Sequence, residues 1–155
     1  MQNGRMNRLI LFIAQGAYSG RSPFAPGTAG SVVGVLLYLC IAHQPLWGYL
    51  LACGATTLVG IWSAGKAEDL LGRKDDGSIV IDEIAGFLVS MILVPPARSF
   101  IVAGFFLFRF FDVVKPWPLR RLQDLHGGAG VVLDDIGAGI YTNITLQLAT
   151  WIIKS

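Results

Sequence analysis

Five acidic residues lie beside long apolar runs, where an ionised carboxylate is costly. Asp82 and Glu83 occur in SIVIDEIAGFLVSMILV, Asp112 follows FIVAGFFLFRFF, and Asp134 and Asp135 occur in GVVLDDIGAGIYTNI. A charged group in apolar packing needs a cation or a hydrogen-bond network to offset its lost hydration. Because three separate segments share this property, we expect one shared compensating group. A divalent cation together with a phosphate-like substrate is the simplest candidate.

Four of the acids form two pairs of sequence neighbours, Asp82–Glu83 and Asp134–Asp135, and within each pair we expect the two residues to have different roles. One acid in a first helical turn is explained by the helix macrodipole, but two adjacent acids after an apolar triplet are not. Neighbouring residues on a helix point about 100° apart. We therefore expect one member of each pair to bind metal and the other to contact a neighbouring helix or a metal ligand. The residues alone do not say which member does which.

Two basic residues accompany the middle acidic segment. Arg109 lies three residues before Asp112, so both can share one helix face. They form an internal ion pair, or Asp112 binds metal while Arg109 orients carboxylates or binds a phosphoryl oxygen. Lys115 either extends its ammonium group to a membrane surface or binds phosphate as a point charge. Both alternatives remain open for each basic residue.

A Gly- and Pro-rich segment, GRSPFAPGTAGS at residues 20–31, precedes the first long apolar run. Thr28 is predicted to be the N-cap of a helix, whose free backbone N–H groups would suit a phosphate with Arg21 nearby. Turn-forming composition explains the segment equally well. His126, in the sequence HGG, is a candidate for proton transfer, although a single loop histidine is more often incidental.

The composition indicates one apolar domain over residues 1–155. Of the 155 residues, 54% are hydrophobic and only 14% are charged, against roughly 25% charged in soluble domains. This deficit favours a polytopic membrane protein or an unusually apolar helical bundle. The net charge of +2 is too small to argue for a nucleic-acid partner, and two cysteines are too few for a disulfide framework.

Five apolar runs lack the alternation of β-strands and are mostly too long for them, so we read them as helices. The predicted fold is all-α: a compact polytopic membrane bundle of about five apolar helices with polar cytoplasmic loops. A membrane span needs about 20 residues, and only the last run meets that length comfortably. The runs cover residues 28–42, 48–64, 79–94, 100–114 and 131–153.

The distribution of basic residues supports a membrane topology. If the N-terminus is cytoplasmic and every run crosses, nine Lys and Arg residues lie on the cytoplasmic side and two on the other, as the positive-inside rule expects. The same topology places every acidic residue on the cytoplasmic side. The nine are Arg5, Arg8, Arg21, Lys66, Arg73, Lys74, Lys115, Arg120 and Arg121, and the two are Arg98 and Lys154.

Four ordered sequence blocks resemble the bacterial phosphatidylglycerophosphatase A family: SGRSPFAPGTAGS, DDGSIVIDEIAG, FRFFDVVKPWPLRRL and HGGAGVVLDDIGAG. They extend over about residues 20–139. The resemblance implies a Mg²⁺-dependent phosphatase of the bacterial inner membrane that converts phosphatidylglycerophosphate to phosphatidylglycerol and phosphate at the cytoplasmic face. On this resemblance the five carboxylates fall in the family's acidic motifs, and Arg109 and Lys115 fall in its Arg/Asp/Lys block.

The leading hypothesis is a multi-pass membrane phosphatase. Its catalytic and metal-binding residues are Asp82, Glu83, Asp112, Asp134 and Asp135; its phosphate-binding residues are Arg109, Lys115, Arg21 and Thr28; and His126 is the proton-transfer candidate. Two alternatives stay open. An ion-coupled transporter would hold its carboxylates near the middle of the membrane, and a soluble helical phosphohydrolase would act on a water-soluble phosphomonoester.

Overall fold

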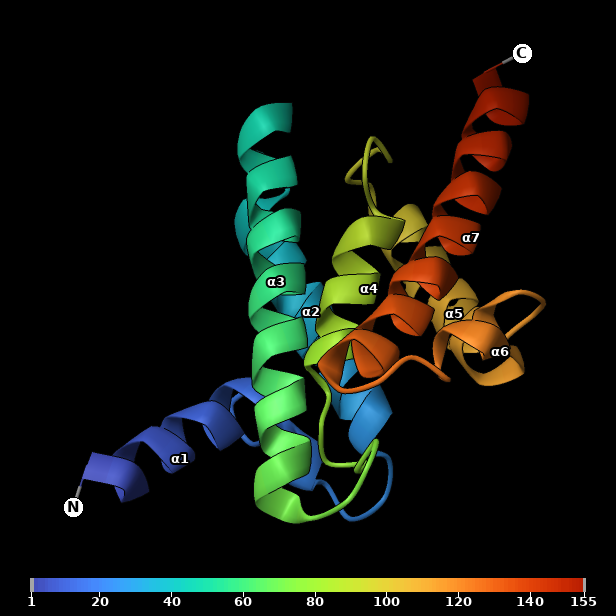
Figure 1. Ribbon diagram of the computed structural model, residues 1–155. Coiled ribbons are helices and arrows are strands. Elements are labelled where there is room, and N and C mark those ends of the chain that lie inside the picture. The colour runs from blue at the N-terminus through green and yellow to red at the C-terminus, as the bar shows by residue number, and fades with distance from the viewer. Residues whose placement is uncertain (1, 155) are drawn as a thin grey trace.

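All regular structure in the described part of the chain is helical, as the apolar runs predict. The computed structural model describes residues 2–154, which form seven α-helices and one 3₁₀ helix and contain no strand (Figure 1). The helices are α1 (Gln2–Ala14), η1 (Ser19–Arg21), α2 (Pro26–Ile41), α3 (Leu46–Leu71), α4 (Ile81–Ser90), α5 (Arg98–Val114), α6 (Leu119–Leu122) and α7 (Gly128–Lys154).

Three helix boundaries differ from the sequence-based expectation. Helix α2 begins at Pro26 with Ala25 as its N-cap, so the prediction of Thr28 as N-cap is wrong. Proline fits the first helical position because its fixed φ matches the helix and its missing N–H costs nothing there. Helix α3 continues through the polar stretch after Ala64 to Leu71. Helix α4 ends at Ser90, so only part of the third apolar run is helical.

Short helix α4 is the centre of the bundle. It packs against α2, α3, α5 and α7, and Figure 1 shows it between α3 and α7. Eight of its ten residues are buried. Phe87 and Leu88 belong to a core cluster that includes Phe108 of α5 and Leu146 of α7. A helix of ten residues is about 15 Å long, and burial on all sides fixes its position and rotation.

Two glycines bring α4 and α7 into close contact. A Cβ atom on Gly86 would lie 2.6 Å from the backbone oxygen of Asp135, and one on Gly139 would lie 2.3 Å from the backbone oxygen of Gly86. Neither position has room for a side chain without a backbone shift. This contact places the acidic pair of α7 beside the first turn of α4.

The C-terminal end of α4 is held by a separate polar contact. The Asn143 side chain on α7 donates hydrogen bonds from Nδ2 to the carbonyl oxygens of Ser90, at 3.0 Å, and Ile92, at 2.7 Å. These carbonyls lie where the helix ends and lack intrahelical partners. Asn143 therefore fixes α4 against α7 at the end opposite Asp82 and Glu83.

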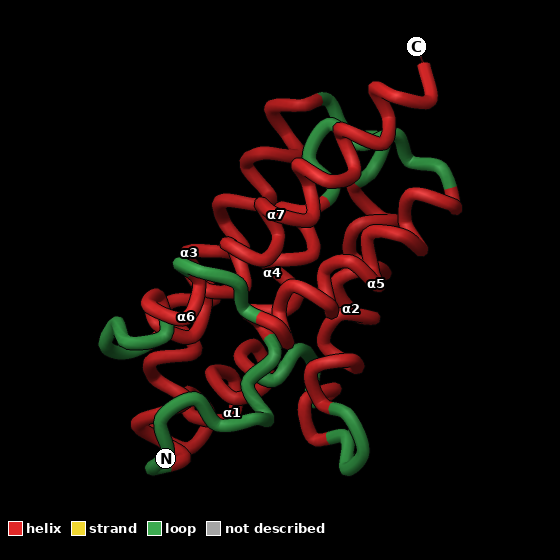
Figure 2. The backbone as a smooth tube through the Cα atoms, turned by 90° about the vertical axis from the view of Figure 1, so that its right-hand side faces the viewer, coloured by secondary structure: helices red, strands yellow, loops and turns green. Residues whose placement is uncertain are grey.

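Two described helices, α3 and α7, are long and apolar enough to cross a membrane by length and composition. Helix α2 is apolar but shorter. The tube view in Figure 2 shows loops joining helices at both ends of the bundle. The expectation of about five membrane-crossing helices is not confirmed, because α2, α4 and α5 have 16, 10 and 17 residues.

Replacing Gly86 with alanine tests the α4–α7 contact. The added methyl group meets the Asp135 backbone and the Phe108 ring, so we expect Gly86→Ala to lower the free energy of unfolding by about 2 kcal/mol. Gly54→Ala is the matched control, because no atom lies within 4 Å of its Cβ position in α3, and it should stabilise by about 0.5–1 kcal/mol. Thermal unfolding in detergent micelles measures both; an equal effect of the two substitutions would contradict the close contact.

Candidate active site

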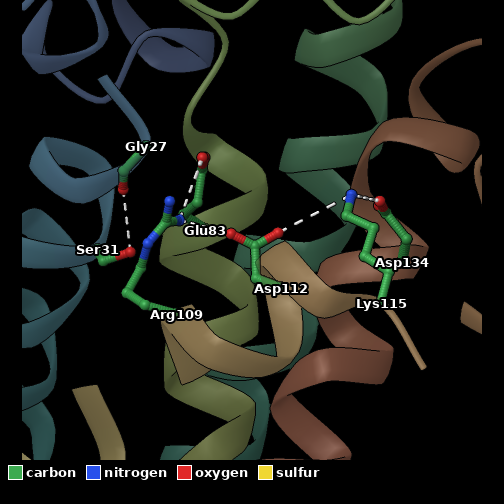
Figure 3. A network of polar contacts seen from close by, with 7 residues as sticks. All are labelled: Gly27, Ser31, Glu83, Arg109, Asp112, Lys115 and Asp134. Atoms are coloured by element: carbon green, nitrogen blue, oxygen red, sulfur yellow. Dashed lines mark hydrogen bonds and ion pairs between the residues drawn. The ribbon is translucent and has the colours of Figure 1, made fainter. Parts of the chain in front are cut away.

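The structure brings all five predicted carboxylates to one site, where α4, α5 and α7 meet. Asp82 and Glu83 lie in the first turn of α4, Asp112 lies in the last turn of α5, and Asp134 and Asp135 lie near the start of α7. Figure 3 shows Glu83, Asp112 and Asp134 arranged around two cations. Four of the five residues are less than 9% exposed, and the Glu83 side chain is 13% exposed.

Three of these carboxylates form a compact group. One oxygen atom from each of Asp82, Glu83 and Asp135 lies within 4.8 Å of the other two. The buried atoms Oδ1 of Asp82, Oε2 of Glu83 and Oδ2 of Asp135 have no hydrogen-bond partner among the described residues. Buried polar atoms are normally paired, so unpaired ones require an explanation. Each acid of this compact group thus has a buried, unpaired oxygen, and the group has the chemistry of a site for a hard divalent cation.

The other two carboxylates are paired with the two cations. Nη1 of Arg109 donates a hydrogen bond of 2.5 Å to Oδ2 of Asp112. Nζ of Lys115 donates to Oδ2 of Asp134 and lies 3.9 Å from Oδ1 of Asp112. The internal ion pair of Arg109 with Asp112 is thus present, and Lys115 pairs with Asp134. Asp112 links the two cations (Figure 3).

Arg109 also connects the paired carboxylates to the unpaired group. Its Nη1 atom lies 3.8 Å from Oε1 of Glu83. The guanidinium group therefore stands between Asp112 and Glu83, with its charge shared by both. Oδ1 of Asp134 is a fourth buried oxygen without a hydrogen-bond partner among the described residues. The two groups of carboxylates are parts of one electrostatic centre.

Gly27 is a residue of this site that sequence reasoning did not single out. A Cβ atom there would lie 2.5 Å from Oε1 of Glu83 and 3.1 Å from both Nη atoms of Arg109. Its missing side chain allows the first turn of α2 to touch this pair. The positive end of the α2 macrodipole then faces the Glu83 carboxylate. A Pro-Gly dipeptide at a helix start was the available signal, but it did not indicate the long-range contact.

Three other predicted residues lie apart from the carboxylates. Thr28 is exposed in the first turn of α2, and His126 is exposed in the loop before α7. Arg21 donates from Nε to Oε1 of Gln15 at 2.9 Å, and its guanidinium carbon lies 4.3 Å from the centre of the Tyr18 ring. Within the described residues, none of the three makes a hydrogen bond or ion pair with the five acids. Their proposed roles in phosphate binding and proton transfer remain predictions.

The fold and site together define an apolar, all-helical protein with a buried acidic centre at one end of α4. The chain belongs to the phosphatidylglycerophosphatase A family, whose profile matches residues 12–150. The resemblance of the four sequence blocks is thereby confirmed. Membership makes the protein an enzyme, a phosphoric monoester hydrolase.

Curated relatives cover most of this chain. A protein of Bacteroides thetaiotaomicron, provisionally named as a phosphatidylinositol-3-phosphatase, is 38% identical over 96% of this chain and 98% of its own length. Phosphatidylglycerophosphatase A of Escherichia coli is 35% identical over 83% of this chain and 76% of its own. Phosphatidylglycerophosphatase A of Haemophilus influenzae is 36% identical over 88% and 86%. No solved structure matches the chain.

The contact between Lys115 and Asp134 makes a testable contribution to stability. Lys115→Met leaves the Asp134 carboxylate buried without its cation, so we expect the free energy of unfolding to fall by about 3 kcal/mol. The double variant Lys115→Met/Asp134→Leu should recover most of this loss, because an apolar pair replaces the buried charges. Chemical unfolding in detergent with EDTA present measures both. Lys74→Met, at an exposed lysine, is the control, and its free energy of unfolding should stay within about 0.5 kcal/mol of that of the unsubstituted chain. An equal loss of stability in the single and double variants would contradict the assigned pair.

Proposed function

We propose that this chain is a Mg²⁺-dependent phosphatase that hydrolyses phosphatidylglycerophosphate to phosphatidylglycerol and inorganic phosphate. The observation that carries the proposal is the group of unpaired, buried oxygens of Asp82, Glu83 and Asp135 beside two cations. Two relatives named phosphatidylglycerophosphatase A suggest the substrate. The proposed site lies at the level of lipid head groups on the cytoplasmic face of the membrane.

The residues present fit a magnesium ion. Carboxylate oxygens are the ligands that Mg²⁺ prefers, and the ion usually retains several waters beside one or two protein carboxylates. Asp82, Glu83 and Asp135 supply unpaired oxygens from two helices that are fixed against each other. Asp112 and Asp134 are less suited as direct ligands, because each accepts a direct hydrogen bond from a cation, whereas Arg109 lies 3.8 Å from Glu83. When bound, Mg²⁺ supplies charge neutralisation at the phosphoryl oxygens and activation of the attacking water.

Arg109 and Lys115 are the proposed phosphate-binding residues. Both cations are held close to the unpaired group, Arg109 through Asp112 and Lys115 through Asp134. Fixed cations stabilise negative charge that develops on a phosphoryl group, because they need no reorganisation during the reaction. Asp112 and Asp134 therefore act by orienting the two cations. This division of roles separates the five acids into proposed metal ligands and orienting residues.

Exposed tryptophans support a position near the membrane surface. Trp47 at the start of α3 and Trp151 near the end of α7 are both 69% exposed, and Figure 1 shows these helix ends at the same end of the bundle. Tryptophans gather at membrane–water interfaces. Asp135 lies 16 residues before Trp151 on α7, or about 24 Å along the helix. Since the hydrocarbon core is about 30 Å thick, this spacing brings the carboxylates close to the opposite interface.

This position favours a phosphatase over an ion-coupled transporter. A transporter holds its ion-binding carboxylates near the bilayer midplane. The cytoplasmic orientation rests on the excess of Lys and Arg on the side of the acids. A lipid substrate can then keep its acyl chains in the bilayer while only its phosphorylated head group enters the site.

One relative supports a second lipid substrate. The Bacteroides thetaiotaomicron protein, with 38% identity over almost its whole length, is provisionally named for phosphatidylinositol 3-phosphate rather than phosphatidylglycerophosphate. Both lipids carry a phosphomonoester on a hydroxylated head group. Metal-assisted hydrolysis would use the same carboxylates for either one. The choice of lipid is therefore a separate question from the type of reaction.

Phosphate release from defined lipids tests the proposed reaction. With purified protein in detergent micelles, we expect release from phosphatidylglycerophosphate that EDTA abolishes and Mg²⁺ restores. Phosphatidylinositol 3-phosphate tests the second lipid, and glycerol 3-phosphate tests a water-soluble phosphomonoester. Preference for glycerol 3-phosphate would instead favour a soluble-type phosphohydrolase. Release that is unchanged by EDTA would contradict the role of a metal.

Amide substitutions test the division of the five acids. Asp82→Asn, Glu83→Gln and Asp135→Asn should each abolish Mn²⁺ binding and lower phosphate release by at least about 100-fold. Asp112→Asn and Asp134→Asn should lower phosphate release while weakening Mn²⁺ binding by about 10–100-fold rather than abolishing it, because they orient cations instead of binding the metal. Asp69→Asn, at an exposed acid of α3, is the control for both measurements. Equal loss of Mn²⁺ binding in all five variants would show that the acids share one role.

A further inference from the structure

Gln15 is a buried polar side chain outside the carboxylate site. It lies in the turn after α1 and is only 3% exposed. Both ends of its amide group are hydrogen-bonded: Nε2 donates to Oγ of Ser78 at 2.9 Å, and Oε1 accepts from Nε of Arg21 at 2.9 Å. The bond to Ser78 joins two segments that are 63 residues apart in the sequence. A buried amide that is hydrogen-bonded at both ends fixes the position of Ser78 relative to α1.

Ser78 belongs to an ordered turn that leads into α4. Its backbone N–H and its hydroxyl both donate to Oδ1 of Asp76, at 3.0 and 2.7 Å. These two hydrogen bonds hold the pKa of the Asp76 carboxyl below its ordinary value. The N–H of Ile79 also donates to the carbonyl oxygen of Asp76 at 2.8 Å. The segment from Asp76 to Ile79 is therefore a closed turn that three hydrogen bonds hold together.

Close contacts from Ala14, Gly20 and Gly30 also hold the segment that leads into α4. The N–H of Val80 donates to the carbonyl oxygen of Ala14 at 2.9 Å. A Cβ atom on Gly20 would lie 2.1 Å from the carbonyl oxygen of Ser78, and one on Gly30 would lie 2.6 Å from Cβ of Val80. These contacts enclose Ser78 and Val80, in the segment that leads into Ile81, the first residue of α4.

The first turn of α4 depends on this enclosure. Its N-cap, Val80, makes no side-chain capping bond, so the helix start has no local side chain to fix it. Asp82 follows Ser78 by four residues. A displacement of Ser78 would therefore act first on the start of α4, which carries the two acids, whereas Asp135 lies on α7.

We infer that Gln15 is a positioning residue of the metal site: its hydrogen bond to Ser78 holds the start of α4 where Asp82 and Glu83 meet Asp135. The inference rests on the proposed function, since it presupposes that these three acids bind a divalent cation. Gln15 itself contacts neither the cation nor the substrate. Partners that orient metal ligands commonly contribute about 10–100-fold to metal affinity.

Binding of Mn²⁺ alone tests this role without an activity assay. Mn²⁺ takes the same oxygen ligands as Mg²⁺, and the electron paramagnetic resonance signal of free Mn²⁺ gives its dissociation constant for the full chain in detergent. Gln15→Leu keeps a similar side-chain volume and removes both hydrogen bonds. We expect its dissociation constant to rise about 10-fold or more. Ser78→Ala removes the same bond from the other side and should give a similar rise.

A double variant and a matched control separate positioning from general destabilisation. In Gln15→Leu/Ser78→Ala the second substitution should add little to the effect on the dissociation constant, because both substitutions remove the hydrogen bond between Gln15 and Ser78. Asn143→Leu is the control: it removes hydrogen bonds at the opposite end of α4. It should lower the unfolding temperature and leave the Mn²⁺ dissociation constant within about twofold of the unsubstituted chain.

Each outcome decides the inference. An unchanged dissociation constant in Gln15→Leu, or an equal rise in Asn143→Leu, would overturn it while leaving the proposed function intact. If Gln15→Leu does not fold, Ser78→Ala decides by the same criterion. If the unsubstituted chain itself binds no Mn²⁺, the proposed metal site and the inference are overturned together.

Discussion

The constraint on which this structure depends is an excess of buried negative charge. Five carboxylates meet at one end of α4, and only two cations, Arg109 and Lys115, form ion pairs with them among the described residues. If all five acids were ionised, three negative charges would remain without a partner. Charges of one sign in a poorly hydrated site repel strongly. The fold holds them together because the surrounding helices leave α4 little freedom to move.

The position of α4 is set by contacts at its start, its middle and its end. At its start, the turn from Asp76 to Ile79 joins it to the segment after α1. In its middle, Gly86 touches the backbone of Asp135. At its end, the side chain of Asn143 meets the last carbonyls. The middle contact lies about one helical turn from Glu83, so the same close packing that joins α4 to α7 also brings their carboxylates together.

The sequence predicted that the five acids would meet and offered the pair of Arg109 with Asp112 as one alternative, but it did not predict the other pairings. Five costly carboxylates in three apolar segments were sufficient to expect one shared centre. Pairing depends on helix rotation, because adjacent residues point about 100° apart, and packing sets that rotation. Only the fold therefore shows that Asp134 meets Lys115 while Asp135 faces Asp82 and Glu83.

Helix boundaries and long-range contacts were harder to anticipate. Helix α3 continues to Leu71 through Lys66, Ala67 and Glu68, residues with good helix propensity that the change in hydropathy concealed. Gly27 and Gln15 belong to ordinary turn-like sequences. Their importance comes from partners 56 and 63 residues away, Glu83 and Ser78. No local pattern encodes such a contact.

The lengths of the helices bear on the type of chemistry. Helix α4 is about 15 Å long, half the thickness of a hydrocarbon core, and its acids lie in its first turn. If α3 and α7 span the bilayer, a short central helix that starts near one surface keeps its N-terminal carboxylates near water and lipid head groups. A translocated ion needs a site that both sides can reach, whereas a lipid phosphate needs access from one surface only. The placement of the acids at one end of α4 thus supports hydrolysis of a phosphate at the membrane surface.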